Sequence, residues 1–179
     1  MYDTEIYQAA LITGVEAALI ASIIMQESSW RKDSTHQDKD GGISYGLMQV
    51  RLDTARRMLD TNELTGEMLI KPYTNILAGA HYLRQSFRKW GNVKDVIASY
   101  NAGMPRKNVF GQYTNSKGDV KVQRYVDRVL DFYRRYKVSK GNFGPLKSGS
   151  VVTGTGILWM GVIGLIASVF LVRSLKTVS

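Results

Sequence analysis

Apolar residues recur at three- and four-residue intervals early in the chain, where Leu19, Ile20, Ile23 and Ile24 fall on one side of a helix. This spacing predicts an α-helix that buries one face in a hydrophobic core. Glu27 continues the same face, four residues after Ile23, so the helix carries its carboxyl group to the edge of the core. Burial disfavours the ionised form of a carboxyl group and raises its pKa, which favours proton donation near neutral pH.

Helical periodicity also governs most of the chain that follows. Stripes of apolar residues run through residues 76–90, 93–100 and 122–136, and their aromatic members are expected to lie in the core. Directly before the first of these stripes, Thr74 or Asn75 is expected to cap the N-terminus of the helix.

Residues 1–137 are therefore predicted to form one all-α domain. The sequence shows no convincing run of period-two alternation, which is the pattern of a half-buried strand. A small β-ribbon is expected at most, near Gly41 to Gly46 or near the stretch FGQYTNSKGD.

The C-terminal part of the chain differs in kind from the rest. Residues 148–172 contain no charged side chain, and the stretch from Ile157 onward is almost wholly apolar. A helix of this length spans a bilayer, so residues 151–172 are predicted to form a single transmembrane helix that anchors the protein in a lipid bilayer. The alternative is an apolar helix buried in an oligomer. Residues 138–150, rich in Gly, Ser and Lys, are predicted to be a linker, and residues 173–179 a short basic tail.

Composition narrows the range of partners. The chain of 179 residues has no cysteine, which excludes disulfides and thiolate metal sites. Its 24 Lys and Arg against 15 Asp and Glu give a formal charge of +9, which favours anionic partners such as cell-wall polymer or lipid headgroups. No nucleic-acid-binding motif accompanies this charge, so nucleic acid is not an expected partner. The first ten residues have two acids and no basic stretch, so they do not predict a secretory signal.

Three short motifs strengthen the interest in Glu27. In SYGLMQV, residues 44–50, a glycine permits close backbone approach and Gln49 offers an amide donor and acceptor. ASYNAG, residues 98–103, puts polar groups at a helix end beside a loop, and RYVDRVL, residues 124–130, lies in the last apolar stripe. Without these motifs, a solvated Glu27 or one paired with its neighbour Arg31 is the simpler interpretation.

Taken in order, the motifs Glu-Ser, Gly-Leu-Met-Gln, Asn-Ile-x-x-Gly-x-x-Tyr-Leu, Tyr-Asn-Ala-Gly and Tyr-Val resemble the catalytic domain of soluble lytic transglycosylases. The resemblance extends over roughly residues 19–136 and implies a goose-type-lysozyme-like fold. It implies that Glu27 is the single catalytic acid/base and that the site needs no cofactor or metal. The substrate-binding residues that it implies are Ser28, Met48, Gln49, Tyr100 and Asn101. Gln49 and Tyr100 are expected to touch the substrate or hold the glutamate, with Met48 and Asn101 behind them.

The resemblance also implies the reaction. Its substrate is the glycan strand of peptidoglycan, cleaved at the β-1,4 bond between N-acetylmuramic acid and N-acetylglucosamine. A protonated Glu27 is expected to donate to the leaving oxygen while the muramic acetamido oxygen attacks its own anomeric carbon. The ionised Glu27 then deprotonates the 6-hydroxyl group, which closes a 1,6-anhydro ring without water.

Two features depart from the usual pattern of this family. Arg51 and Leu52 stand where the family usually has Met-Pro. The preceding loop is a few residues longer than the common form and contains His36, Asp38 and Asp40. These residues leave open a metal-binding loop and a water-activating aspartate, which would make the protein a lysozyme instead. A third alternative is a catalytically silent, membrane-anchored protein that binds the cell wall.

The architecture suggests a setting as well. A wall-cleaving domain must meet peptidoglycan outside the cytoplasmic membrane, and the predicted span lies at the C-terminal end of the sequence. A bacteriophage virion delivers such a domain to the wall from outside, in association with other virion proteins. We therefore expect a single-pass protein of a virion membrane or entry apparatus that degrades the wall during phage entry or release. The competing expectation is a bacterial tail-anchored enzyme.

Overall fold

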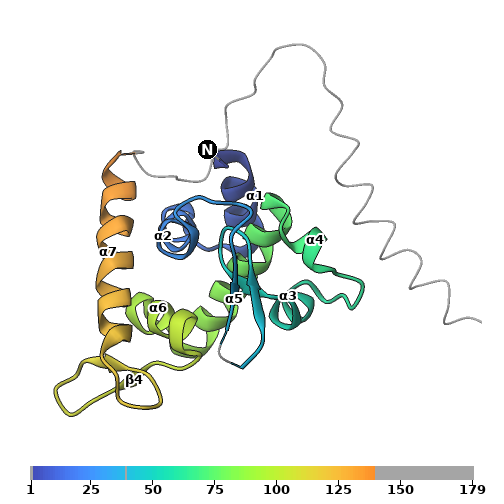
Figure 1. Cartoon of the computed structure of the whole chain (residues 1–179). Coiled ribbons are helices and arrows are strands. Elements are labelled where there is room, and N and C mark those ends of the chain that lie inside the picture. Colours follow the sequence, from blue (N-terminus) through green and yellow to red (C-terminus); the bar gives the residue numbers. More distant parts are fainter. Residues whose placement is uncertain (1, 39, 140–179) are drawn as a thin grey trace, which may run out of the picture. The chain divides into compact units, whose positions relative to one another are not determined.

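The computed structural model describes residues 2–38 and 40–139. This part is a helical domain with a small three-stranded β-sheet and a separate two-stranded β-hairpin (Figure 1). The helices of this part are α1 (Asp3–Thr13), α2 (Ala17–Ser28), α3 (Leu52–Leu59), α4 (Gly66–Leu69), α5 (Pro72–Trp90), α6 (Val93–Ala102) and α7 (Lys121–Ser139). The strands are β1 (Thr35–Gln37), β2 (Ile43–Tyr45), β3 (Val50–Arg51), β4 (Arg106–Lys107) and β5 (Tyr113–Thr114). A mainly helical fold with small β-ribbons is as predicted.

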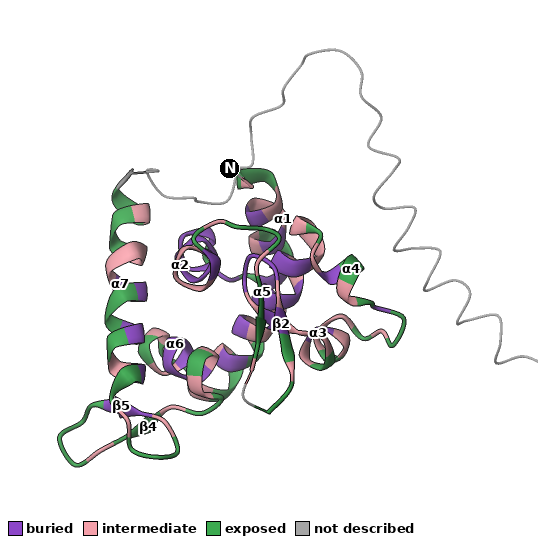
Figure 2. Cartoon of the chain, in the orientation of Figure 1, coloured by how far each residue is buried: buried purple, intermediate pink, exposed green. Residues whose placement is uncertain are grey.

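The core is built around α2, whose residues are buried on almost every side (Figure 2). Leu19, Ile20, Ile23 and Ile24, predicted to face the core, are all fully buried. Helices α1, α5 and α7 pack against α2 and complete its surroundings. A helix that is apolar all round must be enclosed in this way, so the surrounding helices hold α2 and its C-terminal end firmly in place.

The strands on either side of each glycine-bearing loop, the one near Gly41 to Gly46 and the one near FGQYTNSKGD, pair with each other. Strands β1, β2 and β3 form an antiparallel sheet in that order, with His36 opposite Ser44 and Tyr45 opposite Val50. Strands β4 and β5 form a separate antiparallel pair. The predicted ribbon is therefore present in both of the places where it was expected.

The start of α5 differs from the predicted one. Thr74 and Asn75 were expected to cap this helix, but α5 begins earlier, at Pro72, and Lys71 occupies the N-cap position without a side-chain hydrogen bond. The cap prediction is wrong because proline, which has no N–H group to satisfy and a backbone angle already suited to a helix, starts the first turn. Asn75 lies inside the helix, and its side chain bonds backbone groups outside α5 instead of capping the helix.

Asn75 ties α5 to the turn before β3. Its side-chain carbonyl accepts a hydrogen bond from the backbone N–H of Met48 at 2.7 Å, and its amide donates to the carbonyls of Tyr45 and Leu69. Gly46 lies against this amide, and a Cβ atom there would come within 2.6 Å of the Asn75 nitrogen. The fully buried asparagine thus fixes the backbone of the Gly-Leu-Met-Gln motif.

The described residues belong to one compact unit, Met1–Pro145. Their buried hydrophobic side chains run from Ile6 to Leu130, so the unit contains the whole described core, and residues 1–145 are expected to fold on their own. None of the described helices has both the length and the hydropathy of a membrane span. The predicted transmembrane helix, the basic tail and residues 140–150 of the predicted linker lie outside the described residues.

Candidate functional site

Glu27 lies in the last turn of α2, next to the final helical residue. Helix α7 packs along α2 and brings Tyr125 to this point from 98 positions further along the chain. The Tyr125 hydroxyl donates a hydrogen bond of 2.5 Å to Glu27 Oε1. Because Tyr125 is itself buried, this contact holds the carboxyl group from the core side.

The surroundings of Glu27 raise its pKa from 4.5 to about 7. Burial is the main cause, since it disfavours the charged form, and the hydrogen bond from Tyr125 opposes the rise by favouring the carboxylate. The carboxyl group also lies near the negative end of the α2 dipole, which further disfavours a negative charge. Glu27 is therefore able both to give and to accept a proton near neutral pH.

A cavity of about 330 Å³ opens beside this carboxyl group. Its lining comes from α2, the β1–β2–β3 sheet with its loops, α3, α5, α6 and the C-cap residue of α6. The lining residues are Glu27, His36, Asp38, Ser44, Gln49, Val50, Arg51, Thr54, Tyr82, Tyr100, Asn101 and Gly103. Four of the residues predicted from sequence to form the site, Glu27, Gln49, Tyr100 and Asn101, meet here. A cavity of this size with converging polar groups is typical of a small-molecule or glycan subsite.

Gln49 is held in an unusual backbone conformation at the cavity wall. Its φ angle of 48° lies in the left-handed region, and its side-chain amide donates to the carbonyls of Ser34 at 3.0 Å and Gly46 at 2.8 Å. Both amide hydrogens are thereby used within the protein. The side-chain carbonyl of Gln49 remains to accept a hydrogen bond from a ligand.

Tyr100 approaches the same cavity from α6. Its hydroxyl donates to the backbone carbonyl of Met48 at 2.9 Å, and its ring packs edge-on against Tyr82 with centroids 5.3 Å apart. Burial, together with the negative charge of Glu27, raises the pKa of Tyr100 well above its usual value. The phenol therefore stays neutral, and its oxygen retains lone pairs that can accept from a ligand hydroxyl. Asn101 follows it as an exposed amide.

The other two residues predicted for the site lie behind the cavity. Ser28 is 2% exposed, and its hydroxyl donates to the carbonyl of Ile24 within α2. Met48 is fully buried, and its sulfur packs where a side chain at position 79 would otherwise lie, so Gly79 is needed there. Both side chains are engaged inside the protein, and their contact with substrate stays a prediction.

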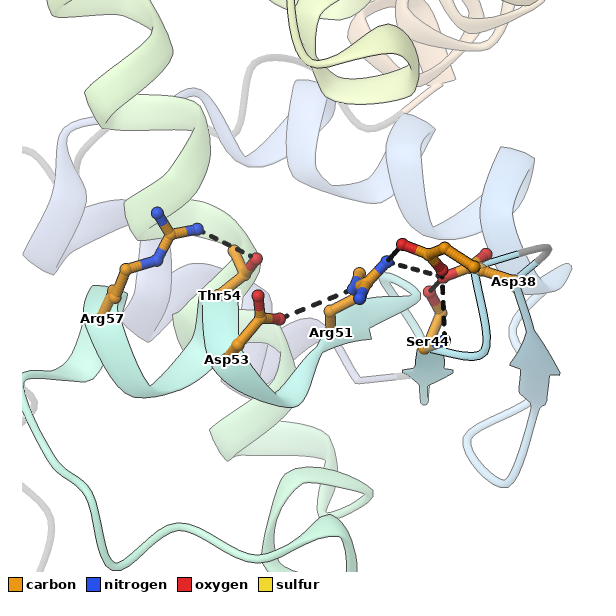
Figure 3. A network of polar contacts seen from close by, with 8 residues as sticks. Asp38, Ser44, Arg51, Asp53, Thr54 and Arg57 are labelled. Atoms are coloured by element: carbon orange, nitrogen blue, oxygen red, sulfur yellow. Dashed lines mark hydrogen bonds and ion pairs between the residues drawn. The ribbon is translucent and has the colours of Figure 1, made fainter.

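The loop that raised the metal and lysozyme alternatives is held by Arg51 (Figure 3). The Arg51 guanidinium lies 2.7 Å from Asp40, 3.7 Å from Asp38 and 3.6 Å from Asp53. Ser44 donates to Asp38 at 3.1 Å. Among residues 2–38 and 40–139, no group of three or more His, Asp or Glu side chains is arranged to hold a metal ion. The acidic residues of this loop are paired with a cation of the protein itself.

Comparison with known proteins identifies the family. Residues 5–123, about two thirds of the chain, match the family described as "Transglycosylase SLT domain". The chain belongs to this family. The resemblance drawn from the short motifs is thereby confirmed, and the helices around Glu27 are those of a transglycosylase domain.

Relatives of this transglycosylase domain occur in bacteria and in a phage. The invasion protein IagB of Salmonella typhimurium is 25% identical over 130 residues, which cover 73% of this chain and 75% of IagB. The transglycosylase of Enterobacteria phage PRD1 is 27% identical over 132 residues, 74% of this chain and 42% of that protein. Among solved structures, the 70 kDa soluble lytic transglycosylase Slt70 of Escherichia coli aligns with a TM-score of 0.63 and 20% identity, over 79% of this chain and 25% of that chain. That alignment shows a shared fold.

One residue that contacts Glu27 in the candidate site was missed from sequence. Tyr125 lies in the apolar stripe of α7, and its spacing alone assigned it to the core, where the structure indeed buries it. Its hydroxyl nevertheless reaches Glu27. The one available signal was the Tyr-Val pair in the family pattern, which marked the position without giving the tyrosine a role.

Proposed function

We propose that the protein is a peptidoglycan lytic transglycosylase that cleaves the β-1,4 bond between N-acetylmuramic acid and N-acetylglucosamine and leaves a 1,6-anhydro product, with Glu27 as its single acid/base. The observation that carries this assignment is a carboxyl group with a pKa of about 7 at the wall of a polar cavity. Membership of the transglycosylase family supports the reaction type.

In the first step Glu27 acts as the acid. Because Tyr125 donates to Oε1, the proton that Glu27 transfers is carried on Oε2. It passes to the glycosidic oxygen as the bond to the anomeric carbon of muramic acid breaks. The acetamido oxygen of the same sugar bonds to that carbon from the other face, so no second carboxylate is required.

In the second step the same group acts as the base. The ionised Glu27, stabilised by the Tyr125 hydroxyl, takes the proton from the 6-hydroxyl group of the muramic sugar. The 6-oxygen bonds to the anomeric carbon and displaces the acetamido oxygen, which closes the 1,6-anhydro ring. The proton that left Glu27 in the first step is replaced, and no water is consumed.

The cavity wall supplies neutral hydrogen-bonding groups for the sugars. The free side-chain carbonyl of Gln49 suits an acetamido N–H or a hydroxyl donor, and the Tyr100 oxygen suits a hydroxyl donor. Asn101 adds an exposed amide at the rim. Neutral partners bind sugar without adding a charge that would alter the pKa of Glu27.

The test is the mass of the muropeptides that residues 1–145 release from purified peptidoglycan. The expected fragments are one water lighter than those with a reducing end. Glu27→Gln should abolish their release, whereas the matched control Glu63→Gln, an exposed carboxylate of the α3–α4 loop, should release them normally. Release that is unaffected by Glu27→Gln would remove Glu27 from the mechanism.

The same experiment decides between this reaction and its two alternatives. A lysozyme would give fragments with reducing ends, and Asp38, which also lines the cavity, would be its water-activating residue. We favour the transglycosylase because the Asp38 carboxylate already accepts from Ser44 and lies beside Arg51. A silent wall-binding protein would release no fragment and would still sediment with peptidoglycan.

The setting proposed from sequence remains a single-pass virion protein that acts on the wall during phage entry or release. The likeness to the transglycosylase of Enterobacteria phage PRD1 supports the phage setting, and the likeness to the bacterial protein IagB supports the bacterial alternative. The membrane span in both proposals rests on the sequence pattern of residues 151–172. Detection of the chain in purified, nuclease-treated particles would support the virion assignment. Its absence from particles, with the chain present in host membranes, would favour the bacterial one.

A further inference from the structure

Among the residues that the structure describes, the turn of the β4–β5 hairpin carries the two most exposed large apolar residues apart from Val138 at the end of α7. Val109 is 93% exposed and Phe110 is 84% exposed. Figure 1 shows this hairpin at the end of the domain where α7 begins, away from Ser139 at the other end of that helix. Neighbouring exposed apolar side chains rimmed by polar residues are a feature of protein and membrane contact sites.

The tip is built rigidly. The Asn108 side chain accepts hydrogen bonds from the backbone N–H groups of Phe110 and Gln112, both at 3.0 Å, and Gly111 closes the turn with a φ of 77°. The Gly111 N–H donates back to the Asn108 carbonyl at 2.9 Å. These bonds hold Val109 and Phe110 outward in a fixed turn.

A second turn of the same construction follows seven residues later. Asn115 accepts from the N–H groups of Lys117 and Asp119, and Gly118, with a φ of 80°, donates to the Asn115 carbonyl. The sequences NVFG and NSKG thus form two like turns, one presenting apolar side chains and the other a lysine. Two structured prongs therefore extend from the same end of the domain.

The segment that carries the apolar tip is rich in basic residues. Residues 104–121 contain four basic residues and one acidic residue, namely Arg106, Lys107, Lys117, Lys121 and Asp119. Lys107 lies 3.5 Å from Asp95 and Lys121 lies 3.4 Å from Asp119, whereas Arg106 and Lys117 have no ion-pair partner among the described residues. The cationic surface continues onto α7, where Lys121, Arg124 and Arg128, with Asp127, line a hollow of about 520 Å³.

We infer that this two-pronged end of the domain docks on an anionic phospholipid bilayer, with Val109 and Phe110 inserted between the headgroups. The basic residues of the segment, Arg106, Lys107, Lys117 and Lys121, bind the lipid phosphates. Insertion buries apolar surface, and each Lys or Arg near an anionic membrane strengthens binding roughly fivefold. A protein partner fits less well, because the core of a protein interface is depleted in lysine and needs a broad face of about 800 Å² rather than a narrow tip. The inference is separate from the glycan-cleaving activity, because none of Arg106, Val109, Phe110 and Lys117 lines the cavity beside Glu27.

The first test is co-sedimentation of residues 1–145 with vesicles. Binding is expected to mixed phosphatidylglycerol and phosphatidylcholine vesicles and to be much weaker to phosphatidylcholine alone. The double variant Val109→Ser, Phe110→Ser should weaken binding about tenfold or more, with glycan cleavage unchanged. The matched control Leu11→Ser, Ile12→Ser replaces exposed apolar residues of α1 and should bind as the unmodified domain does.

Arg106→Gln combined with Lys117→Gln should weaken binding about twenty-five-fold, from roughly fivefold for each lost charge, and should reduce its dependence on salt. No binding to anionic vesicles would overturn the proposal. So would binding that is equally strong in the Val109 and Phe110 double variant, since charge alone would then account for it.

The second test locates the tip directly. Because the chain has no cysteine, Val109→Cys carries a unique environment-sensitive fluorophore, and Asn62→Cys provides an exposed control site between α3 and α4. Anionic vesicles should shift the emission of the label at position 109 to shorter wavelength and leave the label at position 62 unchanged. A shift at 109 that arises without vesicles and grows with protein concentration would indicate a second copy of the chain as the occupant and would overturn the proposal.

Discussion

Replacing Glu27 by glutamine should make the domain more stable at neutral and alkaline pH. The folded protein holds the pKa of Glu27 at about 7 against an ordinary value of 4.5. Such a difference corresponds to about 3 kcal/mol, at about 1.4 kcal/mol per pH unit. Because the folded state binds the Glu27 proton more tightly than the unfolded state, the free energy of unfolding falls as pH rises from about 4.5 to 7 and is fully reduced above that range.

Urea unfolding of residues 1–145 and of the Glu27→Gln variant at pH values from about 4 to 8.5 measures this effect. The difference between the two should be small and level near pH 4, should grow through the range in which Glu27 ionises, and should reach about 3 kcal/mol in favour of glutamine near pH 8. Glutamine keeps an oxygen that can accept from Tyr125, so the hydrogen bond is not lost. A stability difference that stays constant with pH would refute the argued burial of the charge.

Three further predictions concern residues around the site. Tyr125→Phe removes the hydrogen bond that favours the carboxylate of Glu27, so the pH above which kcat/KM falls should rise by about one unit. If that pH is unchanged or lower, the assigned contact is contradicted. Arg51→Met releases the loop that forms part of the cavity wall, so KM for glycan strands should rise severalfold. The free energy of unfolding, measured in urea, should change by less than about 1 kcal/mol, because the ion pairs are partly exposed. Asn75→Ala leaves the Met48 N–H group buried without an acceptor and should lower the free energy of unfolding by about 3 kcal/mol, whereas Asn62→Ala at an exposed site should leave it unchanged.

The parts of the fold that could be predicted from sequence are those set by local periodicity. The apolar spacing through α2 predicted both the helix and the buried face that carries Glu27, and both are observed. The stripe in α7 was predicted in the same way. Periodicity fails at Asn75, because whether an asparagine caps a helix or bonds a distant backbone depends on a turn at Met48 that lies 27 residues away.

The candidate site was predicted less completely for the same reason. Glu27 and Gln49 stand out locally, the first as an acid on an apolar face and the second as an amide three residues after a glycine. Tyr125 does not, because a tyrosine in an apolar stripe is ordinarily a core residue and the packing of α7 on α2 is a long-range contact. The pairing of Arg51 with Asp38 and Asp40 is likewise a consequence of the hairpin register, which the sequence does not specify.

In the proposed reaction, the Glu27–Tyr125 contact would allow one carboxyl group to serve in both steps. A group that must give a proton and then take one works best when its pKa lies near the working pH, since a higher pKa weakens the acid and a lower one weakens the base. Burial at the end of α2 raises the pKa of Glu27, and the Tyr125 hydroxyl opposes that rise. Both effects depend on the packing of α7 against α2, so this helix pair sets the proton affinity of the site as well as enclosing the core.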